Sequence, residues 1–181
     1  MIVIPTLFNE VFLLKQKLQA DLRGSFTETY NRRDFEKATL RRIDFCQDNT
    51  THSKRGVLRG LHYQLPPFSQ SKLVTVLQGR VLDVIVDLRK GSPTFSQYFS
   101  QELSGENQLQ LFIPRGFAHG YITLSENSIF RYKVDQYYQP ASHGSIAPDD
   151  PQLNIDWNLA KEEWIQSEKD QKNPTFAEAT H

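Results

Sequence analysis

The feature that most constrains the fold of this chain is the shortness of its apolar segments. Short runs of alternating or continuous apolar residues recur along the sequence, and most of them end at Gly, Pro or a polar cluster. Such runs are typical of β-strands, and a long series of them favours an antiparallel sandwich or jelly-roll barrel. We therefore predict an all-β fold with strands near residues 11–14, 25–30, 41–49, 56–64, 72–77, 81–88, 94–103, 108–113 and 129–137.

Helical signals are few and weak. Asn31 is a favourable N-cap for a helix over residues 32–39, and Phe35 would pack that helix against the sheet. Residues 159–164 form a second short candidate. We predict that both helices are peripheral.

Two connections between strands also follow from the pattern. Residues 50–55 are polar and are predicted to form a loop. Gln78 and Gly79 separate the apolar runs 72–77 and 81–88, and this arrangement is typical of a β-hairpin. We expect these two runs to pair with each other.

Size and charge set the general class of the protein. The 181 residues suit a single domain, residues 1–181, with a real core. Lys and Arg total 21, as do Asp and Glu, so the zero net charge argues against nucleic acid or an anionic membrane as a general partner. Cys46 is the only cysteine, which excludes an intramolecular disulfide and favours a reducing compartment. With no signal peptide or membrane span in the pattern, we expect a cytoplasmic protein.

Two motifs share the spacing of the cupin barrels. The first runs from Gly56 to His62 as Gly-x5-His, and the second combines Pro114, Gly116 and His119 as Pro-x-Gly-x2-His. In cupins that bind a metal, two His and a Glu from the first motif meet a His from the second inside the barrel. The motifs therefore indicate a cupin-type jelly roll.

The set of metal ligands in that pattern is incomplete in this sequence. His62 is present, but the next ligand position holds Gln64, no Glu follows closely, and Lys72 begins the next strand. An ammonium group would repel a divalent cation, whose sites use neutral imidazole and carboxylate. We predict that the protein binds no metal and that His62 serves proton chemistry. The alternative is that His62 is an ordinary core histidine.

Several polar residues lie on predicted strands in unusual places. Arg59 and His62 have opposite parity, and Gly60 between them is a suitable site for a bulge that turns both to one side. Asp83 shares a strand face with Ile85. It would orient a histidine, neutralise a lysine or make a structural hydrogen bond.

Tyr132 and Glu28 also have two interpretations each. Tyr132 falls on the apolar face of its strand, where it would serve either as packing or as a proton donor. Glu28 lies between two aromatic residues and needs a partner. That partner would be Arg23, Arg59 or a ligand.

The ordered series of motifs resembles the dTDP-4-dehydrorhamnose 3,5-epimerase family from about residue 11 to about residue 174. The matching segments are Asp21-x-Arg23-Gly24-x-Phe26-x-Glu28, Gln47-Asp48-Asn49, Gly56-Val57-Leu58-Arg59-Gly60-Leu61-His62-Tyr63-Gln64, Lys72-Leu73-Val74, Asp83-Val84-x-Val86-Asp87-Leu88-Arg89, Ile113-Pro114-x-Gly116-Phe117-Ala118-His119-Gly120, Tyr132-Lys133, Asp150-Pro151, Ile155-x-Trp157 and Lys169-Asp170. A single motif would indicate only a cupin, whereas the series is specific for this family.

The resemblance implies a role for each matching residue. His62 would be the catalytic base, Asp170 its carboxylate partner, Tyr132 the proton donor on the opposite face of the sugar, and Lys72 the cation beside the C4 oxygen. The implied substrate contacts are Arg23, Phe26, Glu28, Gln47, Asp48, Asn49, Arg59, His119, Tyr138, His143 and Lys169. The family uses no cofactor and acts on a dTDP-linked 4-keto-6-deoxy sugar. It usually forms a homodimer in which N-terminal strands complete the partner's site.

These roles agree with the chemistry of such a substrate. The protons at C3 and C5 are both α to the C4 carbonyl, so removal of either one gives an enolate. A neutral imidazole with a pKa near ~6.5 is a suitable base, and a fixed cation offsets the developing charge on oxygen. Epimerisation then needs a second group that returns the proton from the other face.

The sequence departs from the family in one loop. The family often has a substrate-contacting glutamate about where His143 stands and a tryptophan near Pro148. Three readings therefore compete. The first is a 3,5-epimerase; the second is a related cupin enzyme, which would be a C3-only or C5-only epimerase or a 3,4-ketoisomerase; the third is a non-catalytic sugar-nucleotide cupin. A metal-dependent cupin oxygenase would need the missing ligands.

Overall fold

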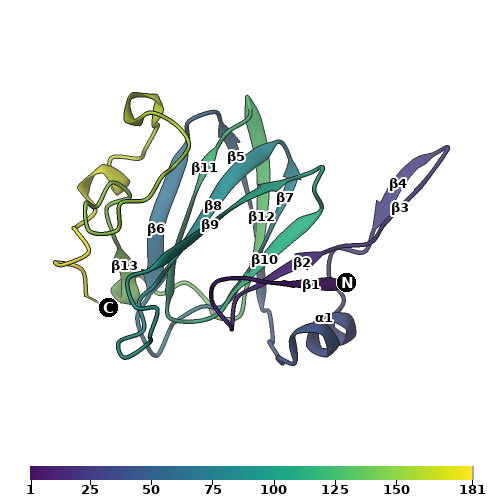
Figure 1. Cartoon of the computed structure of the whole chain (residues 1–181), viewed down its shortest axis with the longest axis horizontal. Coiled ribbons are helices and arrows are strands. Elements are labelled where there is room, and N and C mark those ends of the chain that lie inside the picture. Colours follow the sequence, from purple (N-terminus) through teal and green to yellow (C-terminus); the bar gives the residue numbers. More distant parts are fainter. Residues whose placement is uncertain (181) are drawn as a thin grey trace.

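Two antiparallel sheets packed face to face form the body of the molecule (Figure 1). The computed structural model describes residues 1–180. Within that range the elements are β1 (Ile2–Pro5), β2 (Phe12–Lys15), β3 (Leu18–Asp21), β4 (Gly24–Thr27), α1 (Arg32–Thr39), β5 (Gln47–Lys54), β6 (Leu58–Gln64), β7 (Lys72–Gln78), β8 (Arg80–Asp87), β9 (Tyr98–Ser104), β10 (Leu109–Ile113), β11 (Phe117–Thr123), β12 (Asn127–Val134) and β13 (His143–Ser145), with 3₁₀ turns at Pro140–Ser142, Lys161–Glu163 and Asp170–Lys172.

The two sheets differ in their number and order of strands. One sheet has the order β1-β2-β10-β7-β12-β5, and the other has the order β13-β6-β11-β8-β9. Strands β3 and β4 pair only with each other and project away from the sandwich as a hairpin, which we call the arm (Figure 1). The predicted all-β jelly-roll architecture is confirmed.

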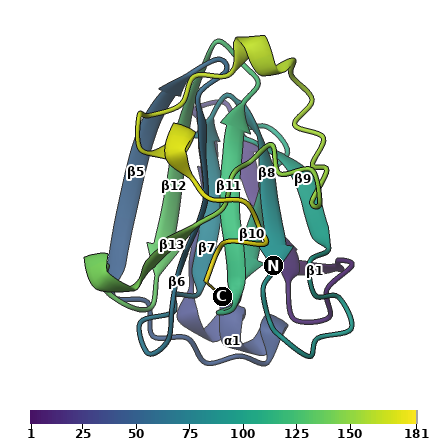
Figure 2. The same cartoon turned by 90° about the vertical axis from the view of Figure 1, so that its left-hand side faces the viewer.

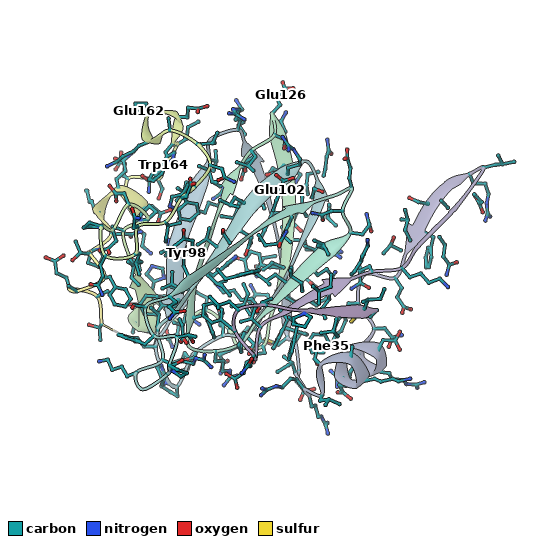
Figure 3. The ribbon with its side chains drawn as sticks, in the orientation of Figure 1. Phe35, Tyr98, Glu102, Glu126, Glu162 and Trp164 are labelled. Atoms are coloured by element: carbon teal, nitrogen blue, oxygen red, sulfur yellow. The ribbon has the colours of Figure 1, made fainter. Side chains whose placement is uncertain are left out.

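Alternation along the strands places the core between the sheets. Val74, Ile85, Leu111 and Phe130 point inward from four different strands, and each is essentially inaccessible to solvent. Side chains fill the space between the sheets (Figure 3). Removing this apolar surface from water is the main source of stability for such a fold.

The outer faces of both sheets are covered as well. Figure 2 shows the C-terminal segment crossing the outer face of the five-stranded sheet, where Trp157 and Phe176 pack against Leu82 and Val84. On the six-stranded sheet, α1 buries Phe35 (labelled in Figure 3) against the ring of Phe112, with ring centroids 5.3 Å apart. Both outer layers follow from strands that are apolar on both faces.

Helix α1 has the predicted bounds. The side chain of Asn31 accepts hydrogen bonds from the backbone N–H groups of Arg33 and Asp34, as an N-cap should. The helix ends at Leu40, which takes a left-handed conformation with φ 55°. The second predicted helix is only the 3₁₀ turn at Lys161–Glu163.

Three predictions about the strands are wrong. The strand expected over residues 41–49 begins only at Gln47, and residues 41–46 lie in no strand. Residues 50–54 are not a loop but belong to β5, which pairs with β12 along its full length at the edge of the sheet. An edge strand tolerates this polar sequence because one of its faces is open to solvent. The expected hairpin is also absent, because β7 pairs with β10 and β12 whereas β8 pairs with β9 and β11.

Among residues 1–180, no helix has the length and apolar character needed to cross a membrane.

Candidate active site

A cavity of about 520 Å³ lies between the sheets. All four predicted catalytic residues line it, namely His62 from β6, Lys72 from β7, Tyr132 from β12 and Asp170 from the C-terminal segment. Three of the predicted substrate contacts line it too: Arg59, His119 and Lys169. Residues far apart in the sequence therefore form one site.

His62 and Asp170 form a hydrogen-bonded pair. The distance from His62 Nε2 to Asp170 Oδ1 is 2.7 Å, and the carboxylate is buried. Burial alone would raise the pKa of Asp170, but hydrogen bonds from His62 and Ser167 outweigh it and hold that pKa below its usual value. An ionised carboxylate only accepts hydrogen bonds, so we assign the imidazole proton to Nε2. This tautomer leaves His62 Nδ1 unprotonated, as a base requires.

The carboxylate reaches His62 on a C-terminal strap, which we define as residues 165–173. Ile165 pairs with the start of β6, where its N–H donates to Gly56 O at 2.8 Å and its carbonyl accepts from Leu58 N at 3.0 Å. At the other end, Asn173 Nδ2 donates to Gly60 O at 3.2 Å. The strap is thus fixed at both ends to β6, the strand that carries His62.

Gly60 allows Arg59 and His62 to share the cavity. The pairing of β6 with β11 shifts register at this point, and Gly60 has φ 128°. A Cβ there would lie 2.5 Å from the Cα of Gly120, so any larger side chain would clash. The predicted bulge is confirmed, and it overrides the opposite parity of the two residues.

Asp83 organises the cationic side of the cavity. Its Oδ2 lies 2.9 Å from His119 Nε2, and both side chains are buried. Burial lowers the pKa of His119, whereas the carboxylate of Asp83 raises it to a smaller extent. Burial likewise lowers the pKa of Lys72 to about 8, against the opposing attraction of Asp83. Asp83 therefore orients a histidine and partly neutralises a lysine, two of the roles considered for it.

Tyr132 is placed to act as an acid. It points inward from β12 beside Phe130, with ring centroids 6.2 Å apart. Burial raises the pKa of its hydroxyl, and Arg59 offsets only part of this effect. The phenol therefore keeps its proton at neutral pH, as a donor must.

His143 lies beside His62 and Tyr138 lies beside His143, and neither lines the cavity. The ring centroid of His143 is 5.3 Å from that of His62 and 5.9 Å from that of Tyr138. Burial, together with the nearby Lys169, lowers the pKa of His143 to about 4. The departure from the family pattern thus places a neutral ring next to His62.

The three predicted contacts on β5 are divided between its faces. Gln47 and Asn49 share a face with Thr51, which lines the cavity, and Gln47 Nε2 donates to Asn49 Oδ1 at 2.7 Å. Asp48 faces the other way and pairs with Lys133 at 2.9 Å. None of the three predicted residues lines the cavity itself.

Arg23, Phe26 and Glu28 lie apart from the cavity. All three are exposed, on the arm or just after it (Figure 1). Arg23 pairs with Asp21 at 2.6 Å rather than with Glu28. The side chain of Arg59 donates to Ser53 Oγ at 3.3 Å. Neither arginine is therefore the partner expected for Glu28.

Sequence reasoning missed a polar group at the back of the cavity. The hydroxyl of Tyr121 lies 2.6 Å from Thr51 Oγ1, and both residues line the cavity. Gln166 and Ser167 of the strap line it as well. Tyr121 follows the second motif closely, but its inward direction depends on the register of β11.

The described part of the chain contains no group of three or more His, Cys, Asp or Glu residues that would hold a metal ion. The histidines of the two motifs are instead paired with carboxylates, and the ammonium of Lys72 occupies the same cavity. The arrangement suits proton transfer next to a carbonyl.

Comparisons with known proteins agree with this chemistry. The family model described as dTDP-4-dehydrorhamnose 3,5-epimerase matches residues 5–178. A dTDP-4-dehydrorhamnose 3,5-epimerase of Salmonella typhimurium is 48% identical over 161 residues, which cover 89% of this chain and 88% of that protein.

Solved structures are similar over nearly the whole chain. The dTDP-6-deoxy-D-glucose-3,5-epimerase of Legionella pneumophila, in complex with dTDP-4-keto-L-rhamnose, has a TM-score of 0.93 and 44% identity, covering 97% of this chain and 93% of that one. A 3'-monoepimerase of Streptomyces bikiniensis, in complex with dTDP-quinovose, has a TM-score of 0.87 and 30% identity, covering 96% and 87%. On the match of the family model and these relatives, this chain belongs to the dTDP-4-dehydrorhamnose 3,5-epimerase family.

Proposed function

We propose that this chain is an isomerase that inverts C3 and C5 of dTDP-4-dehydro-6-deoxyglucose to give dTDP-4-dehydro-L-rhamnose, a step of dTDP-L-rhamnose biosynthesis. The observation that carries the proposal is the meeting of a histidine–carboxylate pair, a lysine and a tyrosine in one cavity. The family and the sugar nucleotides named for its relatives agree with it.

The geometry supports a two-base mechanism. His62 Nδ1 removes the proton from C3 or C5, and the electron pair of that C–H bond moves toward the C4 carbonyl to form an enolate. The ammonium of Lys72 offsets the charge on the C4 oxygen, and Asp170 stabilises the imidazolium. Tyr132 then delivers a proton to the opposite face of the carbon, which inverts it.

The nucleotide is bound, we propose, by residues of two subunits. Arg59 at the cavity supplies a guanidinium for the pyrophosphate, whose oxygens accept bidentate hydrogen bonds. Arg23 and Phe26 stand on the exposed arm and Glu28 directly follows it, and none of the three lines the cavity of its own chain. In a homodimer the arm of one copy would reach the cavity of the other and contribute these residues.

One specific observation favours a second candidate, which is epimerisation at a single carbon. The structurally similar protein from Streptomyces bikiniensis is a 3'-monoepimerase. His143, a neutral ring where the family often has glutamate, lies next to the base and would alter how the sugar sits.

Deuterium incorporation tests the proposed function. After incubation of the enzyme with dTDP-4-keto-6-deoxyglucose in D₂O, we expect NMR to show deuterium at both C3 and C5 and inversion at both carbons. Inversion at C3 alone would establish the monoepimerase. If deuterium entered at neither C3 nor C5, the proposal would be contradicted altogether.

The pH profile should show the titration of Lys72. Its pKa is lowered to about 8, so the ammonium is present below that pH and is lost as the pH rises. We expect kcat/KM, which reports the groups of the free enzyme, to fall as pH rises through about 8. Arg keeps its proton at this pH, so Lys72→Arg should retain lower activity but move the alkaline limb upward, toward the range where Tyr132 ionises.

Measurement of kcat/KM from about pH 6 to pH 10 checks this result. Lys90→Arg, a change of the same type at an exposed lysine, should keep the wild-type profile. An alkaline limb that stays in place in Lys72→Arg would assign the titration to another group.

A further inference from the structure

A row of polar side chains crosses the outer face of the six-stranded sheet. Thr75 of β7 is the cross-strand neighbour of Gln110 on β10 and of Arg131 on β12. Gln110 is almost fully buried, and its Nε2 donates to Thr75 Oγ1 at 2.8 Å. We call Gln110, Thr75 and Arg131 the arm-root row, because Gln110 and Arg131 contact the segment where the arm joins the body.

The row holds the segment that follows the arm. Gln110 Nε2 donates to the backbone carbonyl of Thr29 at 2.9 Å, and Arg131 Nη2 donates to Thr29 Oγ1 at 2.8 Å. The backbone and the side chain of one residue are thus fixed by two different strands. Thr29 stands two residues after the last residue of β4.

Gln16 completes the attachment on the other side of the arm. It follows β2, and its Nε2 donates to Gln110 Oε1 at 2.6 Å. The amide of Gln110 thereby connects the segment entering the arm with the segment leaving it. A buried amide with all these partners is costly to replace, because each group left unpaired loses its hydrogen bonds to water as well.

The arm itself offers little other support for its direction. Strands β3 and β4 form a separate two-stranded sheet and are almost wholly exposed. A hairpin of this kind keeps a fixed direction only if its base is held. The row holds the root of the arm. Its member on β12, Arg131, directly precedes Tyr132, which points into the cavity.

We propose that the arm-root row positions the arm so that its residues reach the active site of a second copy of this chain. Gln110, Thr75 and Arg131 are positioning residues, since none of them lines the cavity. The inference rests on the homodimer of the proposed function, and it adds the residues that direct the arm.

The first test separates binding from chemistry. Gln110→Leu removes the amide at nearly constant volume, and Thr29→Val removes only the hydroxyl that Arg131 holds. Both variants should raise the KM for the dTDP-linked substrate about tenfold while kcat stays close to wild type, because remote binding is lost but the catalytic groups remain. Gln78→Leu, the same change at an exposed glutamine of β7, should leave both constants unchanged.

The second test restores the site by mixing subunits. Gln110→Leu has an intact base and a loose arm, whereas His62→Ala has no base and an intact arm. In a doubly tagged heterodimer, one site combines the base of the first subunit with the arm of the second. Over a range of substrate concentrations, such dimers should show wild-type KM and about half of the wild-type kcat per dimer.

Phe26→Ala serves as the reference for a defect in the arm itself, and it should also be complemented by His62→Ala. Complementation of Phe26→Ala but not of Gln110→Leu, or an unchanged KM in Gln110→Leu and Thr29→Val, would overturn the role of the row. Failure of both mixtures would overturn it together with the shared site. Deuterium exchange by the wild-type enzyme reports separately on the proposed reaction.

Discussion

In D₂O, the His62→Ala variant should return its substrate with no deuterium at C3 or C5 and with neither carbon inverted. Without the imidazole no group in the cavity is positioned to form the enolate, since Asp170 lies behind the ring and His119 is bound to Asp83. Loss of a general base costs about 10²–10⁴-fold in rate. NMR of the recovered sugar nucleotide measures exchange and stereochemistry together.

His52→Ala provides the matched control for this prediction. His52 is an exposed histidine of β5, and its removal should leave both exchange and inversion at the wild-type rate. Deuterium appearing at C3 or C5 in His62→Ala at the wild-type rate would remove His62 from the role of base.

The Tyr132→Phe variant should exchange without inverting. The enolate still forms, because His62 and Lys72 are intact, but the imidazolium returns a proton only to the face from which it came. We therefore expect deuterium at C3, C5 or both, with inversion reduced about 10²–10⁴-fold. The two measurements respond in opposite ways, which distinguishes the donor from a packing residue.

If Tyr132 were packing alone, the phenylalanine variant would remain nearly as active as wild type, since it lacks only the hydroxyl. Near-normal inversion would therefore point to water or His119 as the acid. Tyr98→Phe makes the same change on β9 of the other sheet (labelled in Figure 3) and should leave the product unaltered.

Features with local causes could be predicted from the sequence. Helix α1 has the predicted bounds because an N-cap at Asn31 and an apolar Phe35 are signals within a few residues of each other. The bulge at Gly60 was visible for the same reason, since parity and a glycine are local observations. The inward direction of Tyr132 also followed from simple alternation.

Features that depend on residues distant in the sequence could not be predicted from local patterns. The apolar runs of β7 and β8 are adjacent in the chain and separated by a turn, yet each joins a different sheet, because its neighbours come from β9 to β12. The polar sequence of β5 forms a strand only because β12 offers it an edge. Asp170, in a segment with no strand pattern, was identified by resemblance alone.

The resemblance implied a site shared between two copies, but it did not say which of the contact residues lie outside their own cavity. Arg23 and Phe26 were grouped with Arg59 as nucleotide contacts, whereas in one copy of the chain they stand on a hairpin outside the cavity. A motif records which residues act together in the working enzyme, and these may come from two copies of one sequence. The structure of a single chain distinguishes contacts that lie in its own cavity from contacts that lie outside it.

The late position of Asp170 bears on how the enzyme is made. The dyad joins residues 108 positions apart, so during synthesis His62 and every strand from β1 to β13 emerge before its carboxylate does. Chains grow at about 5–20 residues per second and fold from the N-terminal side. A nascent or prematurely terminated chain that lacks residues beyond Trp164 would therefore display the strands of the sandwich with an idle base. Under the proposed mechanism the base gains its carboxylate partner only once translation has delivered the strap, so an incomplete product should epimerise the sugar nucleotide far more slowly than the full chain.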